Sequence, residues 1–374
     1  MKIGITCYPT YGGSGAMATE LGIALAHRGH EIHFITYRQP FRLPAFLPRV
    51  FFHEVDVGRY PLFEYPPYDL ALAVRMHEVV LAHHLDILHC HYAIPHATSA
   101  WIAKEMLEDQ RPDIKVLTTL HGTDITIVGQ DPSFHAITKF SIEKSDGLTA
   151  VSRFLQQETI SAFGCTGCRI EVIPNFVDPT VYDRARYPGS RGAFGDGRPV
   201  LMHISNFRPV KRVVDIIRTF ALVTAQIPSL LVMVGDGPDR ILAEQEARRL
   251  HVQDQVMFLG KIESVAPLLA SANLYLLPTD RESFGLSALE ALASGTPVIG
   301  ANAGGLPEVV DNGVTGALCA VGDVDGMAAA ALEILGNRDR WTVMSRAAAA
   351  DARRRYSLTD VVAHYERFYT QALA

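Results

Sequence analysis

Residues 2–36, KIGITCYPTYGGSGAMATELGIALAHRGHEIHFIT, decide the class of fold. Lys2–Cys7 is a short run rich in β-branched residues, and the glycine cluster Gly12–Gly15 follows it. Ala16–His27 then carries apolar residues at helical spacing, and Glu31–Thr36 again has the composition of a strand. A strand, a glycine-rich loop, a helix and a second strand form the unit that opens a doubly wound parallel sheet.

The same pattern continues along the chain and starts again after a linker. Further strand-like runs occur at Ile87–His91, Val116–Leu120, Gly147–Val151 and Ile170–Ile173. Tyr187–Pro199 is rich in Gly, Pro and Arg and predicts a linker. The strand-like runs after it are Val200–Ile204, Leu230–Val234, Val256–Leu259, Leu274–Leu277, Pro297–Gly300 and Ala317–Cys319. We predict an α/β protein with two Rossmann-like domains, residues 1–185 and 198–356, that face each other across a cleft, and a C-terminal helix, 357–374, that packs back on the first domain.

Composition excludes several classes of protein. The chain has 374 residues, of which 48% are hydrophobic and 20% charged, so a packed globular core is expected. The 34 Lys+Arg against 40 Asp+Glu give a net charge of −6, which argues against a nucleic-acid partner. No apolar run approaches the roughly 20 residues of a membrane span, and a strand begins at Lys2, where a secretory signal would lie. With five cysteines, an odd number, we expect a cytoplasmic protein without a disulfide framework.

The residues that carry chemistry are concentrated in Arg281–Ala291, RESFGLSALEA. Glu282 lies just before a predicted helix and Glu290 on its second turn, so their carboxylates can hold two hydroxyl-bearing parts of one ligand. The alternative is a capping carboxylate and a solvated helix face. A second glycine-rich turn, Ala303–Glu308, follows another strand and makes that alternative weaker. The first cluster, Gly12–Gly15, lacks both the G-x-G-x-x-G spacing and a P-loop lysine, so it binds a phosphate or is a tight turn only.

The E-x-F-G-x-x-x-x-E pattern at 282–290, with G-G-x-x-E at 304–308, resembles the retaining, nucleotide-sugar-dependent glycosyltransferases of family 4, which have the two-domain GT-B fold. The resemblance covers essentially the whole chain. In the first domain it is closest to the members that start bacillithiol biosynthesis, and it rests on the segments Lys2–Gly22, Gly29–Thr36, Tyr65–Leu70, His89–Ala97 and Thr118–Ile125. It implies transfer of N-acetylglucosamine from UDP-N-acetylglucosamine (UDP-GlcNAc) to the hydroxyl group of L-malate with retention.

The resemblance also implies roles in binding the donor. Glu290 is expected to hold the ribose hydroxyls of UDP, Glu282 a sugar hydroxyl, and Lys211 the diphosphate. The predicted donor-binding residues are Gly12, Gly13, Asn206, Arg208, Lys211, Gly237, Ile262, Glu282, Ser283, Phe284, Gly285, Leu286 and Glu290. This sequence has Asn206 where the wider family has Arg, so the second cation on the diphosphate is either Arg208 or Arg212. Such cations stabilise the charge that develops on the leaving phosphate. We therefore expect no metal ion and no cofactor.

The acceptor is expected in the first domain. His121, together with Lys211 and Glu282, is predicted to be catalytic, through its side chain or its backbone carbonyl near the reacting carbon. The candidate ligands of malate are Ser14, Tyr92, Thr119, Thr123 and Arg153. Asp124 is the nearest candidate for a nucleophile, but we expect it to orient His121 or to cap a turn. The departing phosphate would then help to deprotonate the acceptor hydroxyl on the same face.

Several alternatives remain open from the sequence. An inositol phosphate could replace malate as the acceptor, the chain could be a UDP-GlcNAc 2-epimerase, or it could bind nucleotides without catalysis. A homo-oligomer is compatible with the sequence. The Cys165–Cys168 spacing is expected to be a turn with two incidental thiols, and His89-Cys90-His91 is expected to have a structural or acceptor-site role and not to hold a metal.

Overall fold

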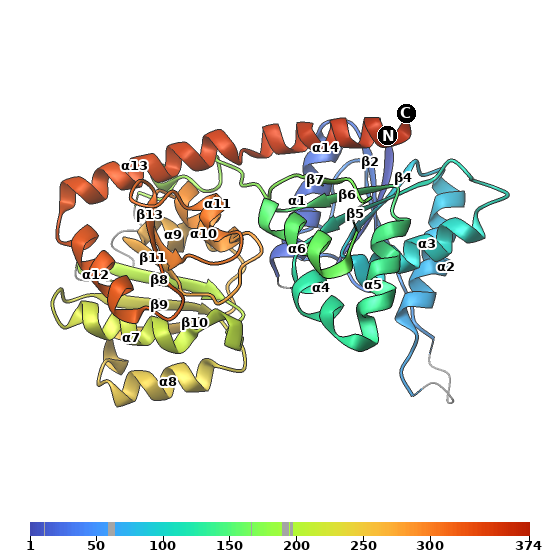
Figure 1. The fold of residues 1–374 in the computed structure, drawn as a ribbon. Coiled ribbons are helices and arrows are strands. Elements are labelled where there is room, and N and C mark those ends of the chain that lie inside the picture. Colours follow the sequence, from blue (N-terminus) through green and yellow to red (C-terminus); the bar gives the residue numbers. More distant parts are fainter. Residues whose placement is uncertain (11, 59–63, 166, 189–193, 195–196) are drawn as a thin grey trace. The chain divides into compact units, whose positions relative to one another are not determined.

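The computed structural model describes residues 1–374 except 11, 59–63, 166, 189–193 and 195–196. It divides into two compact units, the first formed by Met1–Asn175 with Thr359–Ala374 and the second by Phe176–Leu358. Each unit contains one fully parallel sheet, of seven strands in the first and six in the second (Figure 1). The prediction of two Rossmann-like parallel-sheet domains is therefore confirmed.

The first unit has the strand order β3-β2-β1-β4-β5-β6-β7. Its strands are β1 (Lys2–Thr6), β2 (Glu31–Thr36), β3 (Val50–Glu54), β4 (Ile87–His91), β5 (Lys115–Leu120), β6 (Gly147–Ala150) and β7 (Ile170–Val172). Its α-helices are α1 (Gly13–His27), α2 (Tyr68–His83), α3 (Thr98–Met106), α4 (Thr123–Thr126), α5 (Pro132–Lys144), α6 (Arg153–Phe163) and α14 (Leu358–Leu373). Because all strands are parallel, the carboxyl ends of β1, β4, β5 and β6 lie at one edge of the sheet.

Helices cover both faces of this first sheet. α2 and α3 lie side by side on one face, where Met76 and Val80 pack with Ile35 of β2 (Figure 1). α14 lies on the opposite face, where the hydroxyl of Tyr369 is 2.8 Å from Nδ1 of His89. Glu366 of α14 also forms an ion pair with Arg28 at 2.9 Å. The apolar stripe of the C-terminal helix is thus buried against the first unit.

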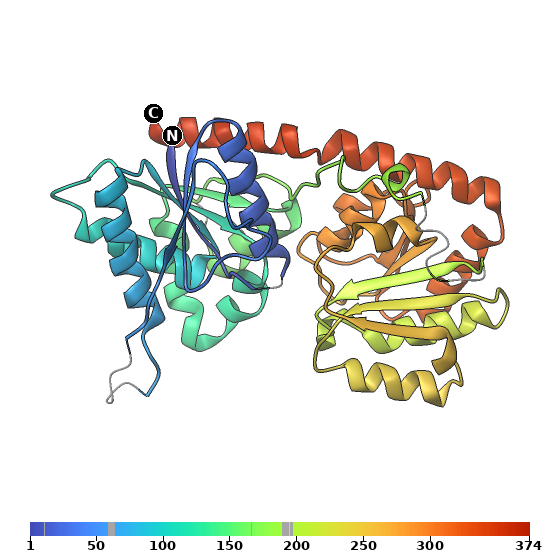
Figure 2. The same ribbon diagram turned by 180° about the vertical axis from the view of Figure 1, so that it is seen from behind.

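The second unit has the strand order β10-β9-β8-β11-β12-β13. Its strands are β8 (Val200–Ser205), β9 (Leu230–Gly235), β10 (Val256–Gly260), β11 (Leu274–Leu277), β12 (Val298–Ala301) and β13 (Gly316–Cys319). Its α-helices are α7 (Val213–Thr224), α8 (Arg240–Arg249), α9 (Ala266–Ser271), α10 (Leu286–Ala293), α11 (Leu306–Val309), α12 (Val324–Leu335) and α13 (Arg338–Arg355). α7, α8 and α12 bury one face of the sheet, and α10 packs on α13 at the other (Figure 2).

The boundary between the units lies at Asn175, earlier than the predicted end of the first domain at residue 185. The segment that follows belongs to the second unit because its side chains bond there. The guanidinium group of Arg184 donates to the carbonyl oxygens of Ala272 (2.8 Å) and Ser294 (3.1 Å). Most of the predicted linker at 187–199 lies outside the described residues.

Two further sequence predictions concern the membrane and the cysteines. Among the residues described, none of the helices combines the length and the apolar character needed to cross a membrane. The structure places the sulfur atoms of Cys165 and Cys168 together in the turn after α6, with the Cα atoms 5.4 Å apart. The two thiols that the spacing predicted to be incidental are therefore neighbours.

Candidate active site in two half-sites

The first half-site, which we call the donor half-site, lies in the second unit around Lys211 and Glu282. Nζ of Lys211 donates to Oε2 of Glu282 at 2.7 Å, and both side chains are largely buried. Lys211 ends the short 3-10 turn after β8, and Glu282 follows β11, the neighbouring strand. The sheet thus brings together a cation and a carboxylate that the sequence separates widely.

Glu290 lies on α10 and is almost fully buried. Oε1 of Glu290 accepts a hydrogen bond from the hydroxyl of Tyr182 at 2.6 Å. A buried carboxylate needs such donors, because its desolvation without them costs on the order of several kcal/mol. Tyr182 therefore fixes the rotamer of Glu290.

Close backbone approaches shape the donor half-site. Gly304 has φ +60°, and a Cβ atom there would lie 2.1 Å from the carbonyl oxygen of Glu282. The amide of Gly305 donates to that same oxygen at 2.7 Å. A Cβ atom on Gly237 would lie 2.0 Å from the carbonyl oxygen of Asn206, so the loops after β8 and β9 touch. These glycines are required because any side chain would displace the loops that hold Glu282 and Asn206.

The N-terminus of α10 offers backbone donors next to Glu282. Gly285 caps this helix in the left-handed conformation, with φ +99°, and has no side chain that could accept from the first turn. The amide groups that open a helix are unsatisfied within it and attract anions. Ser283 and Leu286 are partly buried, whereas the ring of Phe284 is buried against Tyr356, with ring centroids 5.5 Å apart. The segment 283–286 can therefore bind a phosphate only through its backbone and Ser283.

The structure distinguishes the two candidate arginines. Arg212 donates to Asp215 at 2.7 Å and to Asp280 at 2.9 Å, and these two carboxylates raise its pKa. Arg208 is exposed, and within the described part of the chain it forms no ion pair. Arg212 thus anchors α7 to the loop after β11, and Arg208 is the arginine with an uncommitted charge. Ile262 lies exposed in the loop after β10.

The second half-site, which we call the acceptor half-site, lies in the first unit around His121, at the carboxyl end of β5. Nε2 of His121 lies 2.8 Å from Nδ1 of His91, the last residue of β4. Burial lowers the pKa of His121 to about 3 and holds that of His91 well below its usual range, so both rings are neutral at pH 7. Nε2 of His91 is buried, and no hydrogen-bond partner for it lies among the described residues.

These contacts select one tautomer. If His121 donated from Nε2, His91 would carry its proton on the unpartnered Nε2, and a buried N–H without an acceptor is costly. We infer that His91 donates from Nδ1 to Nε2 of His121. His121 then carries its proton on Nδ1, where it can donate to a hydroxyl of a ligand.

Asp124 is fully buried and serves the backbone. Its carboxylate accepts from the amides of Gly122 (2.9 Å) and Ala93 (3.1 Å), which ties the loops after β5 and β4 together. Burial outweighs these bonds and raises the pKa of Asp124 to about 6. Its place within this turn matches the expected capping role, and its oxygens are aimed at the backbone and away from any ligand.

Thr119 does not line the acceptor half-site, contrary to the sequence prediction. Its hydroxyl is fully buried 2.7 Å from Nε2 of His89 and 2.7 Å from the hydroxyl of Thr149. Its hydroxyl also lies 3.5 Å from that of Tyr365, so α14 covers Thr119. Thr119 instead belongs to the polar layer that supports β4 and β5 from behind.

The other predicted acceptor residues lie at the same edge of the first sheet. Ser14, in the first turn of α1, donates to the hydroxyl of Tyr92 at 3.3 Å. The ring of Tyr92 lies 5.6 Å from that of His121. Thr123 opens α4 and Arg153 opens α6, where Arg153 is exposed. Gly12 and Gly13 form the exposed start of α1, which has no side-chain cap.

Comparison with known proteins identifies the family of this chain. The family described as "Glycosyltransferase Family 4" matches residues 11–181, and "Glycosyl transferases group 1" matches residues 190–351. The N-acetyl-alpha-D-glucosaminyl L-malate synthase of Bacillus anthracis is 47% identical over 375 residues, which cover 100% of this chain and 97% of the relative. The chain belongs to glycosyltransferase family 4.

Two further comparisons place this glycosyltransferase more broadly. The D-inositol 3-phosphate glycosyltransferase of Mycolicibacterium paratuberculosis is 29% identical over 91% of the chain and 81% of the relative. The crystal structure of Anabaena HepE in complex with UDP-glucose has a TM-score of 0.81 and 20% identity, over 99% of this chain and 100% of that one. The latter likeness shows the shared GT-B fold.

Several residues that build the half-sites of this glycosyltransferase were not predicted. Tyr182 contacts Glu290 across 108 positions of sequence, and no local pattern signals such a pairing. His91 was noted, but its contact with His121 depends on strands β4 and β5 being neighbours. His96 and Tyr8 pack at the acceptor half-site with ring centroids 4.8 Å apart. Alternation along the strands could have indicated the side for His91, but not its partner.

Proposed function

We propose that this glycosyltransferase transfers N-acetylglucosamine from UDP-GlcNAc to the hydroxyl group of L-malate with retention, as the first step of bacillithiol biosynthesis. The observation that carries the proposal is the 47% identity, over the full length of both chains, to the N-acetyl-alpha-D-glucosaminyl L-malate synthase of Bacillus anthracis. The two half-sites supply groups suited to the two substrates. A cytoplasmic location, where UDP-sugars and malate are found, is part of the proposal.

The donor half-site would bind the nucleotide sugar through fixed charges. Glu290, held by Tyr182, accepts from the ribose hydroxyls, and the amides that open α10 face the phosphates. In the absence of substrate Lys211 is paired with Glu282. On binding, Lys211 turns its charge to the diphosphate and Glu282 accepts from a sugar hydroxyl.

Bond cleavage builds negative charge on the β-phosphate while the sugar becomes oxocarbenium-like. Lys211 and Arg208 stabilise that charge. A preorganised donor of this kind lowers the activation barrier by about 3 kcal/mol. We propose that no metal ion takes part in the transfer. The departing phosphate accepts the proton of the malate hydroxyl, which attacks from the same face.

The acceptor half-site would hold malate near His121. Arg153 offers a bidentate partner for a carboxylate, and Ser14 and Tyr92 offer hydroxyl groups. His121, neutral and protonated on Nδ1, donates to a hydroxyl of the transferred sugar. Because burial keeps the pKa of His121 near 3, this role does not change across physiological pH.

An inositol phosphate acceptor is the second candidate, because a D-inositol 3-phosphate glycosyltransferase is 29% identical over most of the chain. The test incubates the purified protein with UDP-GlcNAc plus malate, plus inositol phosphate, or with neither acceptor, and identifies products by mass. UDP release and a glycosylated malate only in the first reaction support the proposal. A glycosylated inositol phosphate, or an epimerised donor without acceptor, would replace it.

A further inference from the structure

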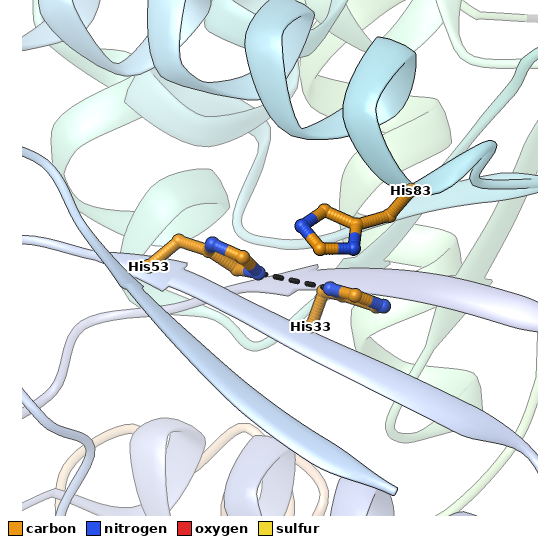
Figure 3. A group of neighbouring side chains, drawn as sticks. All are labelled: His33, His53 and His83. Atoms are coloured by element: carbon orange, nitrogen blue, oxygen red, sulfur yellow. Dashed lines mark hydrogen bonds between the residues drawn. The ribbon is translucent and has the colours of Figure 1, made fainter.

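Three histidines that belong to neither half-site meet at one end of the first sheet. His33 lies on β2, His53 on the edge strand β3, and His83 is the last residue of α2 (Figure 3). Each ring offers one nitrogen atom, and these three atoms all lie within 4.8 Å of one another. Nδ1 of His33 and Nε2 of His53 are 2.9 Å apart. We call these residues the histidine cluster.

The pattern of the sequence explains why the rings converge. His33 is on the same face of β2 as Ile35, two residues on, which packs against α2. His53 pairs in register with Ile35 on the neighbouring strand. On α2, His83 continues the buried stripe of Met76 and Val80 at helical spacing. The histidine cluster therefore occupies positions that would normally continue the apolar core.

Imidazole binds metal ions in its neutral form. Burial lowers the pKa of His33, and burial with the neighbouring imidazoles lowers that of His53 to about 4. The cationic side chains nearby are compensated, since Lys2 lies 3.4 Å from Glu31 and Arg75 donates to Glu78 at 2.9 Å. No net positive charge thus opposes a cation at this point.

Glu31 orients one of the rings. Its Oε1 lies 3.1 Å from Nε2 of His33, so His33 carries its proton there and presents the lone pair of Nδ1 to the cluster. A carboxylate behind a ligating imidazole is the arrangement that fixes the tautomer in metal sites. Without a metal, His53 must donate from Nε2 to His33. With a metal ion bound, the proton of His53 would lie on its Nδ1. The lone pairs of Nδ1 of His33 and Nε2 of His53 would then both face the ion.

We propose that His33, His53 and His83 bind one divalent transition-metal ion, of which Zn²⁺ is the best match, with the remaining position open to solvent. Three imidazole ligands favour Zn²⁺ over Mg²⁺ or Ca²⁺, which prefer oxygen ligands. Zn–N bonds of about 2.0–2.1 Å in tetrahedral geometry place the nitrogen atoms about 3.3 Å apart. The 2.9 Å between Nδ1 of His33 and Nε2 of His53 is already close to this nitrogen–nitrogen distance. The other separations, up to 4.8 Å, need only small side-chain movements.

The ion would be structural. His33 lies toward the amino end of its strand, whereas the acceptor half-site lies at the carboxyl ends, so the cluster contributes nothing to the transfer of the sugar. Strand β3 has a partner on one side only. A metal ion bound by β2, β3 and α2 would hold this edge strand to the helix, and binding to the folded state alone raises its stability.

The experiment titrates the full chain, stripped with a chelator and returned to metal-free buffer, with ZnCl₂ by calorimetry and measures Tm with and without zinc. His53→Gln and His83→Gln remove ligands that are only partly buried, so the variants should fold. His27→Gln, at an exposed histidine of α1, is the matched control. Glu31→Gln tests the positioning role of the carboxylate.

We expect one zinc ion per chain for the wild type and for His27→Gln, with an increase in Tm on addition of zinc. His53→Gln and His83→Gln should lose the binding and the increase in Tm, and Glu31→Gln should bind about 10–100-fold more weakly. Equal binding by the wild type and both ligand variants, or no binding by the wild type, overturns the proposal. Glycosyltransfer measured on the same samples should not depend on zinc, so this outcome is independent of the proposed reaction.

Discussion

The two arginines beside Lys211 offer the sharpest test of the donor half-site. Arg208 has no ion pair in the described part of the chain, whereas Arg212 is bonded to Asp215 and Asp280. We therefore predict that Arg208→Ala impairs catalysis and Arg212→Ala impairs stability. Neither result could be assigned in advance from the sequence, where both arginines are candidates for the second cation on the diphosphate.

The magnitudes follow from the environments. Loss of a donor aimed at the leaving phosphate costs about 3 kcal/mol of transition-state stabilisation, so Arg208→Ala should lower kcat about 100-fold. Arg212→Ala leaves Asp215, which is buried, with Arg218 alone at 3.4 Å. The ion pair between Arg212 and the exposed Asp280 contributes little to the stability of the fold. We expect a loss of about 1–2 kcal/mol in the free energy of unfolding.

The assay measures UDP release at saturating UDP-GlcNAc and malate, together with thermal unfolding of each variant. Arg208→Ala should have low kcat and an unchanged Tm. Arg212→Ala should keep kcat within about threefold and unfold several degrees lower, at about 2–4 °C per kcal/mol. Arg248→Ala, at an exposed arginine of α8, controls for loss of surface charge. A large fall in kcat for Arg212→Ala with unchanged Tm would refute the assignment.

Three further predictions test other parts of the structure. Glu290→Ala should weaken UDP binding about tenfold or more, measured by calorimetry, with a smaller effect on kcat; unchanged affinity would remove it from the ribose site. Gly304→Ala should lower kcat, because its Cβ atom would lie 2.1 Å from the carbonyl oxygen of Glu282, whereas Gly313→Ala, with positive φ but open space, should leave kcat intact. Burial lowers the pKa of His89 to about 3 in the folded protein, against about 6.5 in the unfolded chain. The contribution of neutral His89 to the free energy of unfolding is therefore complete above pH 6.5 and is lost as the pH falls toward 3. Denaturant unfolding should therefore show that the wild type loses about 1.4 kcal/mol more than His89→Gln between about pH 7.5 and 5.5, and equal losses would contradict this.

The sequence predicted the repeated strand–helix pattern well, because hydrophobic periodicity and glycine turns are local properties. It also predicted that Glu282 precedes a helix and that Glu290 lies on the second turn of that helix, since helical spacing is a local property. It failed for Thr119, where a strand residue next to the site turned out to face α14. It did not indicate that Cys165 and Cys168 are neighbours, because spacing alone does not decide whether two thiols meet.

By itself, then, the sequence determined the fold class and the chemical types of residue available at the carboxyl ends of the strands. Only the tertiary structure decided the pairings: Tyr182 with Glu290, His91 with His121, and Arg212 with two carboxylates. It also brought together His33, His53 and His83, which no short motif connects. The physical reason is that these contacts join different strands and helices, whose neighbours are set by sheet order and packing and not by distance along the chain.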